Sequence, residues 1–302
     1  MAARRGPARA VIAGRFVAWT LFGVAVATGT LSDRVEPRAP IWIGGYRVLA
    51  ADFHVHCGFP GGAALAPWDL VFEARRRGLD AFALTPHNTV FGGRIGRLVA
   101  RRVGGPTVLA GEEIRTSTYH LMAIGVERST SPRLPAASAI AEVHRQGGVA
   151  IAAHPNAAFW PAYDAESMAA LDGSEVCHPG GIFRERKAAE MRLFYERVRH
   201  AAIGSSDYHG LGWMGMCRTY VFAADDSEAA IVDAIRAGRT VVYDREGRAF
   251  GDAELIGAAA ADGRLPEPDR SWSDPGALAR FSRALGILAL AWIILAGLPR
   301  AA

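Results

Sequence analysis

The chain has 302 residues, of which 50% are hydrophobic and 21% are charged. This composition excludes a disordered or fibrous chain and leaves room for one large domain, or two small ones, with a substantial core. The net charge is +4, but Lys187 is the one lysine, and the arginines are spread thinly along the chain. Because a nucleic-acid-binding face concentrates its basic charge, this distribution argues against a nucleic-acid partner.

Two uncharged apolar runs lie near the ends of the chain, at residues 16–31 and 284–298. Each is shorter than the ~20 residues that span a bilayer comfortably, but we interpret both as membrane helices, within segments 1–31 and 284–302. The first run is alternatively a cleaved signal peptide with its small-residue site at 25–27, and the second is alternatively a buried core helix. If both runs are membrane helices, the bilayer is a partner of the protein.

The arginines around these runs bear on orientation. Those before the first run favour a cytoplasmic N-terminus by the positive-inside rule, which places the middle of the chain outside the cytoplasm at a bacterial-type inner membrane. The arginines on the inner flanks of the two runs oppose this orientation. In chain order the residues concerned are Arg4, Arg5, Arg9 and Arg15 in favour, and Arg34, Arg38, Arg47, Arg280 and Arg283 against, while Arg300 lies in the tail 299–302.

Between the two runs, residues 32–47 and 251–283 have the composition of linkers, and 48–250 form the body. The body alternates short apolar runs, typical of buried strands, with amphipathic stretches at helical period. This alternation predicts parallel strands with helical crossovers, and about seven units favour a closed α/β barrel over an open sheet. The predicted strands are 48–53, 80–85, 107–114, 120–126, 148–154, 174–178 and 201–207; the predicted helices are 67–77, 92–102, 136–146, 182–199 and 227–237.

Histidines and carboxylates gather at the ends of these predicted strands, where an α/β barrel holds its active site. His54 and His56 are two residues apart on the first strand, so both imidazoles point the same way. Imidazole and carboxylate together form the ligand set for Zn²⁺, Mn²⁺ or Fe ions, so the pattern predicts a multinuclear metal site. The other candidates end later strands, or in one case begin one: His87, Glu112, Glu113, His120, His154, Asp207 and His209. We interpret His144, His178 and His200 as structural, and His178 is the least certain because it also ends a strand.

The three cysteines, Cys57, Cys177 and Cys217, are far apart and form no CxxC pair. The spacing therefore indicates neither a zinc ribbon nor a disulfide framework. We expect small buried residues with free thiols, although Cys57 follows a His-x-His and is a candidate for the metal site. Free thiols argue mildly against an oxidising compartment.

The ordered set of motifs resembles that of the PHP (polymerase and histidinol phosphatase) domain, over about residues 48–245. The motifs are His54-x-His56, the run Thr85-Pro86-His87-Asn88, Gly111-Glu112-Glu113 with His120, His154-Pro155, and the run Ser206-Asp207-Tyr208-His209. Within the family, the chain looks most like the stand-alone metal-dependent phosphoesterases. This resemblance implies a distorted seven-stranded (β/α) barrel with two or three metal ions at its C-terminal face.

The resemblance also implies a role for each ligand. His54, His56, Glu113 and Asp207 would hold one ion, and Glu113 would bridge to a second held by His120 and His154. His87 and His209 would serve a third ion. Glu113 matches the family's Gly-x-Glu pattern better than Glu112, because the apolar Ile114 follows it. Pro86 stands where the family usually has an acidic residue, and the first motif continues as 57–62 without its usual ligand, so we expect a dinuclear site with the third position weak or empty.

The expected function is hydrolysis of a small phosphorylated substrate by a metal-activated water. Arg115 and Arg218 are the candidates for holding the phosphate, although surface arginines are as plausible in so arginine-rich a chain. His209 or His87 would protonate the leaving oxygen if the third ion is missing. Two alternatives are a carboxylic ester or carbamate hydrolase on the same site and a metal-binding module without turnover.

Overall fold

The computed structural model describes residues 6–32, 36–58, 63, 65–182, 184–198, 200–210, 213–268 and 276–295. The chain divides into two compact units: Glu36–Trp272, and Met1–Val35 together with Ser273–Ala302. Arg4, Arg5, Arg34, the tail 299–302 and the segment 59–62 that follows the first His-x-His motif lie outside the described residues.

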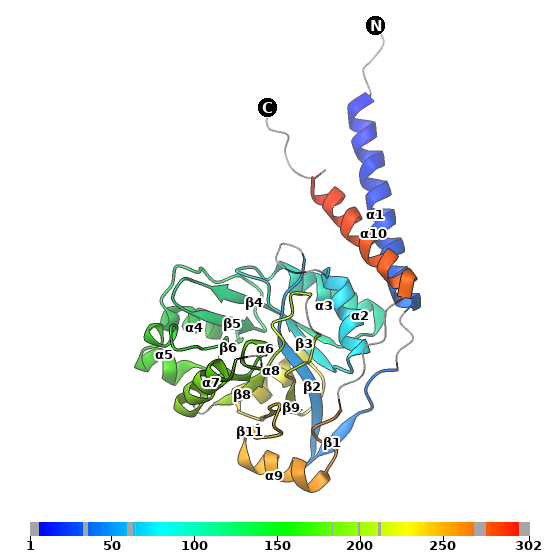
Figure 1. The fold of residues 1–302 in the computed structure, drawn as a ribbon. Coiled ribbons are helices and arrows are strands. Elements are labelled where there is room, and N and C mark those ends of the chain that lie inside the picture. Colours follow the sequence, from blue (N-terminus) through cyan, green and yellow to red (C-terminus); the bar gives the residue numbers. More distant parts are fainter. Residues whose placement is uncertain are drawn as a thin grey trace. The chain divides into compact units, whose positions relative to one another are not determined.

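The larger unit is built on one mixed sheet of eleven strands among the described residues (Figure 1). Strands β2–β4 run parallel, as do β6–β8, whereas β5 is antiparallel to both β4 and β6, and β9 is antiparallel to β2. The strand order is β11-β10-β9-β2-β3-β4-β5-β6-β7-β8, with β1 beside β2. The bounds are β1 Ile41–Ile43, β2 Tyr46–Val55, β3 Ala81–Leu84, β4 Thr107–Arg115, β5 His120–Ile124, β6 Val149–Ala152, β7 Gly173–Cys177, β8 Ala201–Gly204, β9 Thr219–Ala223, β10 Thr240–Tyr243 and β11 Ala249–Gly251.

The sheet curves into a nearly closed barrel. Its last strand, β8, returns to β9, where the Gly204 N–H donates to Thr219 Oγ1 and the Thr219 hydroxyl donates to the Gly204 carbonyl, each at 2.9 Å. No β-ladder between β8 and β9 is recorded among the described residues. The curvature brings the ends of strands far apart in sequence to one place.

Helices pack against the sheet and form most of the connections between its parallel strands. On α3, a Cβ added to Gly93 would lie 2.7 Å from Ala110 Cα of β4, so only glycine permits this close approach. On α8, Ile231 and Ile235 share a buried cluster with alternate residues of β2. The helices are α2 Pro67–Arg76, α3 Phe91–Val103, α4 Ala136–Arg145, α5 Ala165–Ala170, α6 Pro179–Ile182, α7 Glu185–Val198, α8 Glu228–Arg236 and α9 Ala253–Asp262, with a short 3₁₀ turn η1 at Trp160–Ala162.

The seven predicted strands are all present, but the expectation of a seven-stranded, all-parallel barrel needs correction. The structure adds β1 and β9–β11, and it places β5 and β9 antiparallel to their neighbours. Segments with linker composition also carry regular structure: 32–47 contains β1, and 251–283 contains α9 and the start of α10. In the first of these segments the glycines form a turn and not a flexible linker: Gly44 and Gly45, both at positive φ, connect β1 and β2 in a tight hairpin.

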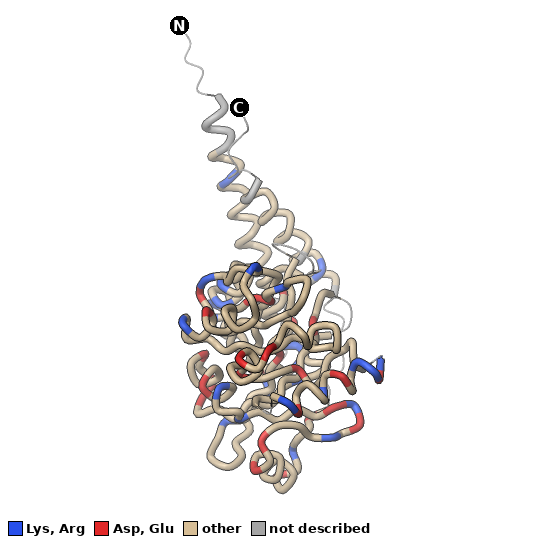
Figure 2. The backbone as a smooth tube through the Cα atoms, turned by 90° about the vertical axis from the view of Figure 1, so that its left-hand side faces the viewer, with Lys and Arg blue, Asp and Glu red and all other residues tan. Residues whose placement is uncertain are grey.

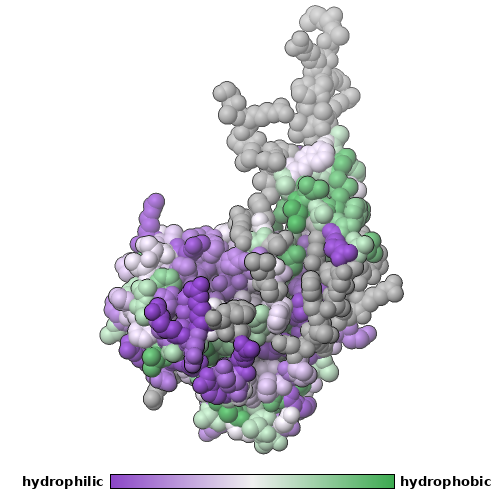
Figure 3. Space-filling model, viewed as in Figure 1, coloured by the Kyte–Doolittle hydropathy of each residue, from purple (hydrophilic) through white to green (hydrophobic). Residues whose placement is uncertain are grey.

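The smaller unit contains a pair of helices, α1 (Gly6–Ser32) and α10 (Gly276–Leu295), which pack against each other. The Ser282 hydroxyl donates to the Ala25 carbonyl, and a Cβ added to Gly14 would contact the Trp292 ring at 3.4 Å, so the helices are antiparallel. Hydrophobic residues gather on this pair, whereas the visible face of the larger unit is largely hydrophilic (Figure 3).

Among the described residues, no helix combines the length and the apolar character needed to cross a membrane. The predicted transmembrane helices, the membrane localisation and the outward orientation of the barrel are therefore corrected. Both uncharged runs fall short of a comfortable span, and in the structure the two helices that contain them pair with each other.

The cysteines also need correction. Cys177 and Cys217 form a disulfide that joins the end of β7 to the segment just before β9, and Cys57 is free and buried. Their separation of 40 residues in sequence gave no hint of the pairing, because the curved sheet brings their Cα atoms to 5.5 Å. Because these two thiols are paired, they do not count against an oxidising compartment.

Candidate metal centre

All eight predicted metal ligands lie at one end of the barrel, at the carboxyl ends of its parallel strands. His120 belongs there although it begins β5, because β5 is antiparallel to β4 and starts where β4 ends. His54 and His56 are fully buried, and Glu113 is 1% exposed. We call the eight side chains the ligand cluster: His54, His56, His87, Glu113, His120, His154, Asp207 and His209.

Glu113 stands at the centre of the cluster, with its two carboxylate oxygens facing different imidazoles. Oε2 lies 3.4 Å from Nε2 of both His54 and His56. Oε1 lies 2.7 Å from His120 Nδ1 and 3.2 Å from His154 Nε2. A carboxylate so placed can serve one cation with each oxygen.

Asp207 closes the first of these two groups. Its Oδ1 lies 3.3 Å from His54 Nε2 and 3.1 Å from His56 Nε2. Although they lie this close, the three buried atoms (His54 Nε2, His56 Nε2 and Asp207 Oδ1) do not have the geometry of a hydrogen bond with any group among the described residues. Buried polar atoms left without partners are costly, so their convergence on one point fits a divalent cation that accepts all three as ligands.

The pKa values of Glu113 and His54 show that the negative charge of the cluster favours a bound positive charge. Burial would raise the pKa of Glu113, but the charge of His54 and the hydrogen bonds from His120 and His154 hold it well below its usual range. Burial would lower the pKa of His54, but Asp207, Glu113 and Glu175 raise it well above its usual value. A bound cation would supply this charge in place of an imidazolium.

Asp52 fixes the turn that carries Asp207. Its carboxylate, buried in β2, accepts the Ser206 N–H (3.1 Å), the Ser206 hydroxyl (2.5 Å) and the Gly215 N–H (2.8 Å). Asp207 itself has φ +45°, a left-handed conformation that a non-glycine residue holds only when its surroundings enforce it. The same is true of His154, at φ +29°.

Glu175 of β7 is a site residue that the sequence analysis missed. It is fully buried, and its Oε1 accepts the His54 Nδ1–H at 3.0 Å, while its Oε2 accepts the His154 N–H at 2.5 Å. Holding the Nδ1 proton leaves the His54 Nε2 lone pair for a cation, the orientation that outer carboxylates give to metal-binding histidines. A charged residue inside an apolar strand run was the available signal.

The two arginines predicted to hold phosphate, Arg115 and Arg218, lie at the end of β4 and directly before β9. Arg115 is exposed at the end of β4, where its backbone N–H donates to Asn88 Oδ1. Arg218 is 8% exposed, and its Nε donates to the Gly215 carbonyl at 3.3 Å. Neither lines the cavity that contains the ligands His154 and Asp207.

Comparisons with known proteins bear on the fold. An uncharacterized protein of Methanocaldococcus jannaschii is 27% identical over an alignment of 117 positions, which covers 35% of this chain and 68% of that protein. The fold is similar to that of a two-domain protein from Bacteroides vulgatus described as containing a predicted PHP-like metal-dependent phosphoesterase, with a TM-score of 0.61, 23% identity and coverage of 76% of this chain and 74% of that one. PsfC from Pseudomonas syringae gives a TM-score of 0.47 at 17% identity, over 72% of this chain and 96% of that one.

A family model described as PHP-associated matches residues 186–240, which include Asp207 and His209. Over this segment the chain is similar to PHP-associated proteins. The motifs that resemble those of the PHP domain follow one another along the chain, and the barrel brings their predicted ligand residues to one end.

The third predicted ligand group is more complete than the sequence suggested. His56, His87 and His209 offer ring nitrogens that all lie within 4.8 Å of one another. His209 Nδ1–H donates to the Asp207 carbonyl at 2.9 Å, which leaves its Nε2 as the ligand atom. Pro86 supplies no carboxylate to this group, so its acidic neighbours are shared with the other groups: Glu113 Oε2 lies 3.0 Å from His87 Nε2, and Asp207 Oδ1 lies 3.4 Å from His209 Nδ1.

Glu112, the neighbour of Glu113, lies outside the cluster on the other face of β4. It is fully buried and accepts the Thr130 N–H, and burial raises its pKa to about 7. The structure therefore places Glu113, not Glu112, among the imidazoles.

Replacing Glu112 with glutamine is expected to stabilise the protein above neutral pH. The folded state holds a proton on Glu112 up to pH about 7, whereas the unfolded chain releases it near 4.5. The free energy of unfolding therefore falls as pH rises through this window. Urea unfolding at pH 5 and pH 8 should show the variant gaining about 1–3 kcal/mol at pH 8 and little at pH 5; an equal gain at both would contradict the assignment.

Proposed function

We propose that this protein is a metal-dependent phosphoesterase that uses two divalent cations. The observation that carries the proposal is Glu113, whose two oxygens face two separate groups of imidazoles. Two-cation sites of this kind are typical of enzymes that displace an alcohol from phosphorus in line.

The residues would divide into two sets around Glu113. His54, His56 and Asp207 would hold one cation, and His120 and His154 the other. Cations of the Mn²⁺, Zn²⁺ or Fe class suit this mixture of imidazole and carboxylate ligands. When bound, the pair would lower the pKa of a water toward neutrality and polarise a phosphoryl oxygen.

The chain's own groups would orient the reactants. Glu175 keeps His54 in one tautomer, and Asp52 keeps the Asp207 turn in place. His209, whose side chain is 36% exposed at the rim of the cluster, is the candidate to protonate the leaving oxygen. His87, with 27% of its side chain exposed, is the alternative donor or the partner of His209 in a third metal group.

A nucleic-acid substrate is less favoured. Along the backbone of the larger unit in Figure 2, positions of Lys and Arg are interspersed with those of Asp and Glu and form no single basic stripe in this view. A groove for single strands would combine positive charge with a row of aromatic side chains. A small phosphorylated molecule is therefore the substrate class that we propose.

One assay separates the candidate activities. The full chain, loaded in turn with Mn²⁺ and Zn²⁺, is offered an aryl phosphate and the matching aryl acetate. Turnover of the phosphate supports the phosphoesterase, and turnover of the acetate alone supports the ester or carbamate hydrolase. Tight metal binding with neither turnover would leave a metal-binding module. Chelator treatment should abolish any turnover, and restoring the metal should recover it.

The proposal also predicts a metal count. Glu113 would bridge two of the proposed groups and Asp207 would complete one of them, so we expect two tightly held ions per chain, with the His56–His87–His209 group weak or empty. Elemental analysis of protein purified without chelator measures this number. Fewer than one ion, or a firm three, would contradict it.

A further inference from the structure

A small cavity of about 170 Å³ opens directly beside the ligand cluster. Two of its walls are the ligands His154 and Asp207, and the others are Asn156, His178, Gly180, Lys187 and Met191. A substrate group that reaches the cations held by His154 and Asp207 would lie in this space. The cavity's other polar groups therefore decide which chemistry it accepts.

Lys187, the one lysine of the chain, lines this cavity. It lies in the first turns of α7 and is half-buried, and no ion pair or hydrogen bond of its ammonium group is found among the described residues. Its sequence neighbour Arg186 is different: that side chain is 89% exposed and pairs with Glu190 at 3.3 Å. A half-buried ammonium group beside a metal cluster, without a carboxylate of its own, is available to an anionic ligand.

His178 adds a donor of fixed orientation to the same cavity. The Gly180 N–H donates to His178 Nδ1 at 2.9 Å, so in the neutral ring the proton is on Nε2. This Nε2 is buried, lies 3.3 Å from Asp207 Oδ2 and lacks a partner of good hydrogen-bond geometry among the described residues. Although the His178 ring approaches His54 and His154 closely enough to form a ligand group, its tautomer makes it a hydrogen-bond donor.

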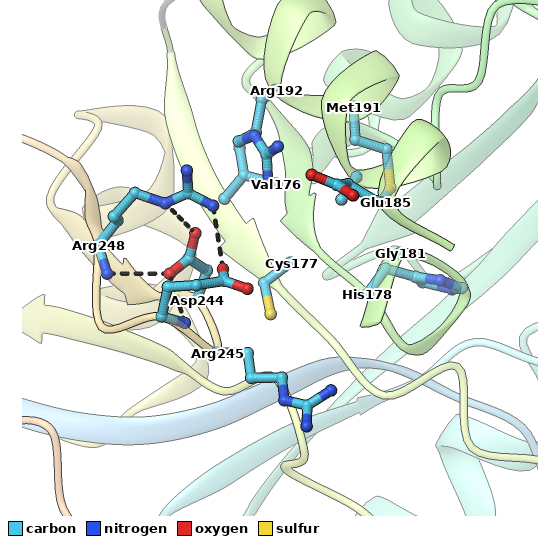
Figure 4. A pocket seen from close by; sticks show the side chains of 12 residues that line it. Val176, Cys177, His178, Gly181, Glu185, Met191, Arg192, Asp244, Arg245 and Arg248 are labelled. Carbon is cyan, nitrogen blue, oxygen red and sulfur yellow. Dashed lines mark hydrogen bonds and ion pairs between the residues drawn. The ribbon is translucent and has the colours of Figure 1, made fainter. Parts of the chain in front are cut away.

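A larger cavity, of about 350 Å³, shares His178 and Met191 with the small one. Figure 4 shows its wall, where Arg248 pairs with Asp244, while Arg192 and Arg245 come from different segments. Its six charged side chains comprise three acids and three bases: Glu185, Asp244, Glu246, Arg192, Arg245 and Arg248. This balanced, polar lining suits a hydrophilic organic group better than a second highly charged one.

We propose that Lys187, with the His178 Nε2–H, binds the phosphoryl oxygens of the substrate in the small cavity, and that the polar alcohol part of the ester occupies the larger one. This inference rests on the proposed phosphoesterase function and adds the residues that hold the anion. It assigns to Lys187 and His178 the role that the sequence suggested for Arg115 and Arg218. The substrate class is a phosphate monoester of a hydrophilic alcohol.

Because the chain has one lysine, Lys187 can be observed on its own. Reductive methylation with ¹³C-formaldehyde keeps the charge of the ammonium group and gives one lysine resonance, apart from that of the N-terminal amine. Inorganic phosphate titrated into the zinc-loaded full chain should shift this resonance saturably. A resonance that does not move while phosphate binds would overturn the proposal.

Variants test the same step by affinity. Lys187→Met should weaken phosphate binding by about 10- to 100-fold, the scale of a hydrogen bond to a charged group, with the metal content unchanged. Lys187→Arg should recover much of the loss, and Arg186→Met, the exposed neighbour, should bind like the parent. Equal affinity in Lys187→Met and the parent would overturn the assignment. If phosphate binds through Lys187 but no phosphate ester is turned over, the proposed function fails and this site assignment stands.

The larger cavity has its own matched pair on α7. Ala188 lines it, whereas Ala189 is not among its lining residues. Ala188→Trp should raise KM for a sugar phosphate at least several-fold while leaving the affinity for inorganic phosphate unchanged, and Ala189→Trp should change neither. Equal effects of the two substitutions, or loss of inorganic phosphate binding in Ala188→Trp, would contradict this placement of the alcohol part.

Discussion

Glu113→Gln is expected to lower kcat for phosphate ester hydrolysis by roughly 10²- to 10³-fold, a loss of about 2–4 kcal/mol of transition-state stabilisation. Glutamine keeps the shape of the side chain but removes the charge that lets one carboxylate serve two cations. An amide also offers one acceptor oxygen instead of two, so the His120–His154 group or the His54–His56 group loses its shared ligand. The measurement is steady-state kinetics of the metal-loaded variant, together with its metal content.

Glu112→Gln is the matched control, since the two residues are adjacent and both are buried. Glu112 contacts Thr130 instead of the cluster, so its replacement should change kcat by less than about threefold while altering the pH dependence of stability. A large kcat effect at Glu112 and a small one at Glu113 would show that Glu112, not Glu113, is the bridging residue.

Asp52→Ala is expected to destabilise the fold by about 3 kcal/mol or more. The substitution leaves the N–H groups of Ser206 and Gly215 buried without an acceptor, and each such orphan costs about 1–3 kcal/mol. Because the same contacts hold the Asp207 turn in a left-handed conformation, the variant should also bind metal more weakly. Urea unfolding, with and without Zn²⁺, measures both effects.

Asp164→Ala is the control for this prediction. Asp164 also accepts a backbone N–H, from Ser167 at 2.8 Å, but it does so as the exposed N-cap of α5. Its loss should cost about 1 kcal/mol and leave metal affinity unchanged. If Asp52→Ala were no more damaging than Asp164→Ala, the carboxylate in β2 would not be holding the Asp207 turn.

The sequence predicted the strands well because each is a short apolar run with a break on either side. It also predicted the cluster, since parallel strands end on one side of a barrel and the histidines and carboxylates follow those ends. The antiparallel strand β5 fits the same rule, because His120 begins it beside the end of β4. What periodicity did not reveal was pairing direction, which depends on contacts between distant segments.

The residues that were missed act through such distant contacts. Glu175 reads as an ordinary residue of an apolar run until the fold brings it to His54, 121 positions away. Lys187 reads as one more charge on a polar helix, and Cys177 and Cys217 as isolated cysteines. At the ends of the chain, the absence of charge favours membrane insertion by composition alone, although the same composition also occurs in two helices that pack together.

Anomalous diffraction from zinc-loaded crystals of the full chain tests the central claim most directly. The account predicts two strong peaks about 3.5–4 Å apart, one on each side of the Glu113 carboxylate. One peak should lie among His54, His56 and Asp207, and the other between His120 and His154. A single peak, or peaks remote from Glu113, would contradict a two-cation centre built on this residue.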